Sequence, residues 1–272
     1  LDSKVRVPVS QAGGVWYVNG DDLYGLSDEE STITIPVKSD YDYTVDMPAW
    51  ITGEKVKEGY NFTLTENTTG NARKGTVIFK SQKGTKEITF VQFGVNDIAG
   101  TYEATYSTFG EGDDWVSETV KIELLQDEEN EAVFYADGLS SIRGVVLPLK
   151  FDGETYQLSA LNGQYLGFIE SQKWYLYTIV RSEAGYVHAD TSLSYPAIAE
   201  LDVDDEELMP FFPFKDKKGF SFTGETGTIK SFIDAIGVYV FASKSPTFGN
   251  NNNLGYYDIF KGLSIKKIKA DH

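Results

Sequence analysis

The chain has 272 residues, no cysteine and a formal net charge of −17, from 24 Lys and Arg against 41 Asp and Glu. The lack of cysteine excludes disulfides, thiolate metal sites and cysteine nucleophiles. The acidity argues against nucleic acid as a partner, because phosphate binding needs a cationic surface. No run approaches the roughly 18 consecutive apolar residues of a membrane helix. Residues 1–95 hold 10 of the basic and 13 of the acidic residues, so most of the acidity lies in residues 96–272.

The first third of the chain alternates apolar and polar residues, a pattern typical of half-buried strands. The clearest runs are residues 32–37, 41–45, 60–64 and 75–79. Trp50-Ile51-Thr52, the turn-rich segment 67–73 and the closing Gln92-Phe93-Gly94 come in the order found in one known module. In these features the segment from about residue 21 to residue 95 resembles the BACON domain, the Bacteroidetes-associated carbohydrate-binding module that is often N-terminal.

The resemblance implies an immunoglobulin-like β-sandwich over residues 1–95, in an exported protein of the outer membrane or cell surface. Such proteins are commonly lipoproteins, so we expect membrane attachment only through a lipid anchor that would lie upstream of this chain. Residues 1–14 are either the first strand of the sandwich or a remnant of an earlier repeat. We favour the first strand, since a lone terminal strand would leave its backbone donors unpaired.

A second all-β domain is predicted over residues 96–272, after a short hinge at residues 95–97. Its opening Gly100-Thr101-Tyr102 suggests a lipocalin-type antiparallel barrel, and the chain then alternates strand-like runs with polar turns. Asp152-Gly153 predicts a tight hairpin, while residues 198–208 and 230–235 are the best candidates for short helices. The segments 163–167 and 255–260 resemble lipocalin-like domains of exported Bacteroidetes proteins of unknown function.

Candidate ligand-binding residues in this domain are aromatic. Trp115 follows the acidic loop 110–114, and Trp174 begins a strand with Tyr175 and Tyr177. Aromatic rings stack on a saccharide while carboxylates accept hydrogen bonds from its hydroxyls. The alternative is that these side chains are core, which is the commoner place for large apolar groups.

The segment around Phe211, Phe212 and Phe214 has the most unusual local composition, because it follows the acidic run 202–207 within a long connection. It is either a lid or contact patch over the barrel mouth, with these three residues binding a ligand, or a plug that fills the barrel end. The acidic run lacks the turn glycine and ligand register of an EF-hand loop. We therefore predict no metal site and no cofactor.

Catalysis has little support, since the chain has two histidines and no nucleophile placed beside a base. We predict a non-catalytic envelope protein that binds a glycan or a small apolar ligand through the second domain. The first alternative is a structural role, with the sandwich as a spacer and an envelope protein as partner. A glycoside hydrolase is the second alternative. Such an enzyme needs two carboxylates at a defined separation in space, and the sequence, with its 41 Asp and Glu residues, does not give that separation.

Overall fold

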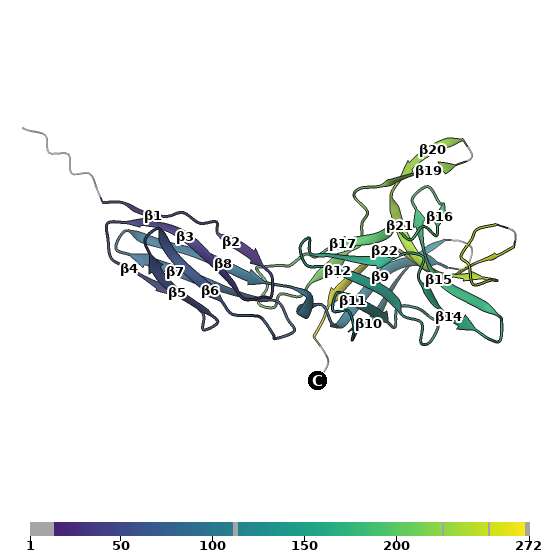
Figure 1. Cartoon of the computed structure of the whole chain (residues 1–272), viewed down its shortest axis with the longest axis horizontal. Helices are drawn as coiled ribbons and strands as arrows, with labels where there is room; N and C mark the ends of the chain where they lie inside the picture. Colours follow the sequence, from purple (N-terminus) through teal and green to yellow (C-terminus); the bar gives the residue numbers. More distant parts are fainter. Residues whose placement is uncertain (1–13, 111–113, 225, 250, 270–272) are drawn as a thin grey trace, which may run out of the picture. The chain divides into compact units, whose positions relative to one another are not determined.

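The structure is a computed structural model, which describes residues 14–110, 114–224, 226–249 and 251–269 (Figure 1). It divides into two compact units: Leu1–Asn67 with Arg73–Gln92, and Thr68–Ala72 with Phe93–His272. In the described residues all regular structure is β-strand, apart from one 3₁₀ turn at Val95–Asp97, so the all-β prediction is confirmed. None of the described helical segments has the length and apolarity to span a membrane. Of residues 1–14, predicted as a first strand or a repeat remnant, residues 1–13 lie outside the described part.

Unit 1 consists of two four-stranded sheets that share one hydrophobic core. The first has the order β1-β3-β6-β5 and the second β2-β8-β7-β4, with only β2 and β8 parallel. Ile35 and Phe62 from the first sheet pack with Phe79 and Phe90 from the second. Trp50 packs at the margin of this core, with the Arg73 guanidinium 4.4 Å from its ring centre. The strands are β1 (Trp16–Val18), β2 (Leu23–Leu26), β3 (Ser31–Ser39), β4 (Tyr43–Asp46), β5 (Ile51–Val56), β6 (Gly59–Leu64), β7 (Arg73–Ser81) and β8 (Gly84–Gln92).

Unit 2 is built on one large antiparallel sheet with the order β14-β15-β21-β22-β9-β10-β11-β12-β13-β17. Two short strands extend it, β16 beside β15 and β18 beside β22, and a separate hairpin is formed by β19 and β20. The strands are β9 (Gly100–Phe109), β10 (Trp115–Gln126), β11 (Val133–Asp137), β12 (Leu147–Asp152), β13 (Gln157–Leu161), β14 (Tyr165–Ile169), β15 (Trp174–Ser182), β16 (Val187–His188), β17 (Ser194–Ile198), β18 (Phe211–Pro213), β19 (Phe220–Gly224), β20 (Gly227–Ser231), β21 (Ile233–Phe241) and β22 (Asn253–Lys267).

The sheet curls until its far edge returns to β22. Single bridges join Ala197 to Phe214 and Glu200 to Phe211, and β18 in turn pairs with the C-terminal half of β22. Strands β22, β9 to β13, β17 and β18 thus form a ring of backbone pairing, with β21, β15 and β14 continuing from the N-terminal half of β22. The curled, barrel-like sheet therefore follows from the pairing itself.

Apolar side chains fill the inside of this ring. Tyr102, Phe134, Leu158, Phe212 and Ile236 belong to one cluster and are each 0% exposed. A side chain with no accessible surface adjoins no space as large as a water molecule, so the interior is packed around these residues. The described interior at these positions leaves no room for a ligand.

Three local expectations are wrong. Residues 198–208 are not a helix, because the backbone of Glu200 exchanges both hydrogen bonds with Phe211 (2.8 and 3.0 Å) and is held extended. Residues 230–235 are not a helix either, because Lys230 belongs to strand β20 and Ile233 begins strand β21. The Asp152-Gly153 hairpin exists between β12 and β13, but its loop is longer than the tight turn expected, since Asp152 pairs with Gln157 and the left-handed residue is Tyr156 (φ 53°).

Candidate functional site

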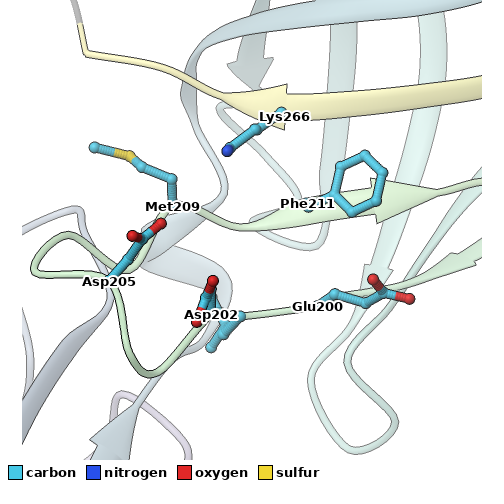
Figure 2. A pocket seen from close by; sticks show the side chains of 7 residues that line it. Glu200, Asp202, Asp205, Met209, Phe211 and Lys266 are labelled. Carbon is cyan, nitrogen blue, oxygen red and sulfur yellow. The ribbon is translucent and has the colours of Figure 1, made fainter.

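An open acidic pocket lies where β17, β18 and β22 meet. Its volume is about 540 Å³. Glu200 follows β17, Phe211 begins β18 and Lys266 lies on β22, while the loop between β17 and β18 contributes Leu201, Asp202, Asp205 and Met209. Figure 2 shows Asp202 and Asp205 on this loop, with Phe211 and Lys266 on the neighbouring strands.

Strand register explains why Glu200, Phe211 and Lys266 line one pocket. Glu200 is bridged to Phe211, and Phe211 is the Cα partner of Lys266. Directly opposed residues on neighbouring strands point to the same face. The three side chains therefore form one cross-strand row, although the residues lie far apart in the sequence.

The pleat separates the three predicted phenylalanines, because successive strand residues point to opposite faces. Phe211 lines the pocket. Phe212 is 0% exposed with its ring 6.4 Å from that of Tyr102, and Phe214 is 5% exposed with its ring 5.5 Å from that of Tyr195. Phe212 and Phe214 are thus core residues, as the plug alternative expected, and only Phe211 is placed to contact a ligand.

The pocket is rich in hydrogen-bond acceptors. Glu200, Asp202 and Asp205 bring three carboxylates against the single ammonium of Lys266. One oxygen of Asp202 accepts a hydrogen bond from the Asp204 amide at 3.0 Å, which fixes the loop and leaves its second oxygen for other donors. Ionised carboxylates only accept, so the pocket suits a ligand that carries several hydroxyl or ammonium donors and an apolar face for Phe211 and Met209.

A second aromatic feature crosses the outer face of the sheet. Tyr165, Tyr177, Tyr239 and Tyr256 are successive cross-strand partners on β14, β15, β21 and β22. The row continues through Phe109, 5.4 Å from Tyr256, to Trp115, which is stacked 4.1 Å from Phe109. We call these six residues the aromatic row.

Most of the aromatic row is not free to bind a ligand. Tyr177 is 6% exposed, and its hydroxyl donates to the Lys244 carbonyl at 3.0 Å. Burial raises the pKa of Tyr177, and it raises the pKa of Tyr239 to about 12. The Trp115 ring already has the ammonium of Lys261 4.6 Å from its centre. The exposed members are the two outer tyrosines, Tyr165 and Tyr256.

The predicted set Trp115, Trp174, Tyr175 and Tyr177 is therefore divided between two faces. Tyr175 lies on the outer face against Phe168, with 4.6 Å between ring centres. Trp174 lies on the other side of β15, packed against the barrel core. Part of the acidic loop predicted to act with Trp115, residues 111–113, lies outside the described residues.

Sequence reasoning missed Glu200, Met209 and Lys266 as pocket residues, and it considered the acidic run at 202–207 only as a calcium loop. Neither Glu200 nor Lys266 belongs to a motif, since both are brought to the pocket by strand register. Across the residues that the structure describes, no group of three His, Asp or Glu side chains is arranged to hold a metal ion.

No protein-family model and no curated protein matches this chain. Among solved structures, the chain is similar to the crystal structure of a protein of unknown function from Bacteroides ovatus. The TM-score is 0.31 and the identity 9%, over 93% of this chain and 91% of that one. A likeness of this degree carries no argument about function.

Proposed function

We propose that this protein is a non-catalytic ligand-binding protein of the cell envelope, which binds a glycan or another small ligand at the acidic pocket of unit 2. The observation that carries the proposal is the meeting of the Phe211 ring with three carboxylates in one open pocket. We place the binding site at the rim of the sheet because the described interior side chains of this unit pack in one buried cluster.

A glycan fits the chemistry of this pocket. The C–H face of a sugar ring packs on an aromatic ring, while its hydroxyls donate to carboxylates and accept from an ammonium. The volume of about 540 Å³ lies within the range of about 300–1,000 Å³ that small-molecule sites occupy. A neutral sugar unit would satisfy the carboxylates without bringing further negative charge into an acidic region.

We also propose that unit 1 is a BACON-like, immunoglobulin-like sandwich and unit 2 a lipocalin-like barrel of an exported lipoprotein. Two facing sheets around one core support the first assignment. The ring of paired strands, which opens with Gly100 and Tyr102 on β9, supports the second. The envelope location rests on the resemblance of residues 21–95 to the BACON domain.

Calorimetric titration with neutral oligosaccharides released from host and dietary polysaccharides tests the binding proposal. We expect Phe211→Ala to weaken the binding by about tenfold, since a lost aromatic contact is worth about 0.5–1.5 kcal/mol. Asp202→Asn should also weaken binding. Phe248→Ala, which removes a 39% exposed ring outside the pocket, is the matched control. Absence of binding to every oligosaccharide, or equal affinity of Phe211→Ala and the wild type, contradicts the proposal.

The alternative of a protein-interaction role is favoured by a different observation. Tyr165, Phe168, Leu254 and Tyr256 are 38–50% exposed on β14 and the N-terminal half of β22. Exposed apolar patches mark interaction sites. If an envelope protein is the partner, the double change Tyr165→Ser and Tyr256→Ser abolishes its cross-linking to this chain while glycan binding persists.

The glycoside hydrolase alternative shares the acidic pocket. A hydrolase acting there would release reducing sugar from a bound oligosaccharide, and Glu200→Gln would abolish the release. We expect no release by the wild-type protein during a prolonged incubation with any oligosaccharide that it binds. Product formation that depends on Glu200 contradicts the non-catalytic assignment.

A further inference from the structure

A second pocket adjoins the outer face of β17 and has the opposite charge. Its volume is about 280 Å³. Lys215, Lys217 and Lys218 line it from the segment that follows β18, and Ser194 and Pro196 line it from β17. We call this the lysine pocket.

The positive charge is unusual because residues 96–272 contain 28 acidic residues against 14 basic ones. Asp216 is the one acidic residue in the described lining, and both of its oxygens are already used. Oδ1 accepts from the amides of Lys218 and Gly219, both at 2.9 Å, and Oδ2 accepts from the Ile233 amide at 3.0 Å.

These three hydrogen bonds hold the lysine segment against the start of β21. Within the described part of the chain, none of the three lysines forms an ion pair with a carboxylate. A group of neighbouring lysines such as this one is ordinarily a solvated stretch of surface with no ligand. Here, however, the hydrogen bonds of Asp216 hold the segment in place, and its three lysines line one concave surface.

The wall of the lysine pocket that β17 forms carries apolar side chains and a serine hydroxyl. Tyr195 and Ala197 of β17 point inward, at 2% and 1% exposed, so Ser194, Pro196 and Ile198 point outward. Ile198 is 47% exposed. An anion attached to a ring with an apolar face therefore has a complementary surface, whereas a free inorganic anion would leave this wall unused.

We propose that the lysine pocket binds a carboxylate or sulfate group carried on a single sugar-sized ring. The lysines supply charge-assisted hydrogen bonds, and Pro196 and Ile198 pack against the ring. The volume of about 280 Å³ is just below the range of about 300–1,000 Å³ for small-molecule sites, which fits a ligand no larger than one ring. This site shares no lining residue with the acidic pocket and goes beyond the function proposed for it.

Calorimetric titration of the full chain with glucuronate, glucose 6-sulfate, glucose and inorganic sulfate tests the proposal. The triple variant Lys215→Gln, Lys217→Gln, Lys218→Gln removes the three cations. Lys38→Gln, Lys57→Gln, Lys83→Gln makes the same change of net charge on exposed lysines of unit 1 and is the matched control. Phe211→Ala shows whether the two pockets are independent.

We expect glucuronate and glucose 6-sulfate to bind the wild type, with an affinity that falls as salt is added. The pocket triple variant should bind them about tenfold or more weakly, since charge-assisted hydrogen bonds are lost. The unit 1 triple variant and Phe211→Ala should bind them unchanged. Three results overturn the proposal: no saturable binding of either sugar anion, equal affinity of the Phe211→Ala variant for glucose and glucuronate, or equal loss in both triple variants. Inorganic sulfate that binds as tightly as glucose 6-sulfate overturns the role given to the ring and its apolar wall.

Discussion

The inside of the barrel-like sheet and its rim use the same residue types in different ways. Phe211 and Phe212 are neighbours on β18, yet Phe212 is 0% exposed in the core while Phe211 lines an open pocket beside three carboxylates. Inside the ring, aromatic side chains contact other apolar groups. Outside the ring they also contact charged groups, as Trp115 on the outer face does with Lys261 and Arg181. The difference shows that the face on which an aromatic residue lies, and not its presence in the sequence, decides whether the residue is buried in the core or lines an open pocket.

The largest expected effect separates interior from rim on β18 itself. Phe212→Ala removes a fully buried ring and should lower the free energy of unfolding of unit 2 by about 3–5 kcal/mol. Phe211→Ala should cost about 1 kcal/mol, because its ring is already partly in water. Denaturant unfolding, followed by a signal assigned to unit 2, measures both. Equal losses would mean that the two faces of β18 do not differ in packing.

A buried polar side chain at the edge of the interior gives the next effect. Asn162 is 1% exposed, its amide donates to the carbonyls of His188 and Asp190 (both 2.8 Å), and its oxygen accepts from the Val180 amide at 2.8 Å. Asn162→Ala leaves these three backbone groups without their partner and should cost about 3 kcal/mol. Asn130→Ala, in an exposed turn with a single such bond, is the control and should cost less than about 1 kcal/mol. A loss at Asn162 no greater than at Asn130 would show that water replaces its partners.

How much of this molecule the sequence predicts depends on the range of the signal. The alternation of apolar and polar residues is a local pattern, so strands such as β3 and β10 can be predicted from the sequence alone. The helix expected at 198–208 fails because a distant partner, Phe211, takes the hydrogen bonds of Glu200. Local propensity carries no information about that partner.

The candidate sites show the same limit. Phe211 was within reach of sequence reasoning because its segment is unusual, but its two pocket neighbours in register, Glu200 and Lys266, come from 11 and 55 residues away. The lysine pocket was missed altogether. Its lysines stand out only against the acidity of the surrounding unit, and the β17 residues that complete it are recognised only once their outward face is known.

An ion-pair network on the outer face gives a smaller effect. The Arg181 Nη1 atom lies 3.1 Å from both oxygens of Asp234, and Lys261 lies 3.4 Å from one of them. Asp234→Asn leaves two cations beside Trp115 without their counter-ion and should cost about 1–2 kcal/mol, since the Asp234 side chain is only 13% exposed. Glu207→Gln breaks the exposed pair with Lys269 and should change stability by less than about 0.5 kcal/mol. Similar losses in the two variants would show that burial does not distinguish these pairs.

The smallest effect is a dependence of stability on pH. His188 lies edge-on against the rings of Phe220 and Phe222, with 4.8 and 4.5 Å between ring centres, and in the described part of the chain its Nε2 atom is buried without a hydrogen-bond partner. This burial lowers the pKa of His188, with Asp190 opposing the shift. In the unfolded chain the histidine pKa is about 6.5. As the pH falls, the unfolded chain therefore binds a proton at a higher pH than the folded chain does. The His188 contribution is therefore present above about pH 6.5 and is lost as the pH falls towards the folded-state pKa.

Denaturant unfolding between pH 5 and 8 measures this effect, and His188→Phe is the variant that tests its cause. The substitution keeps an aromatic ring against Phe220 and Phe222 but removes the proton-binding group, so part of the stability loss below about pH 6.5 should disappear. Carboxylates that titrate at lower pH remain in both proteins and set the common background, with Asp190 the nearest of them. An unchanged slope between pH 5 and 7 in His188→Phe would show that the histidine takes up a proton without disturbing the hairpin, and that this part of the outer face is more open to water than its burial indicates.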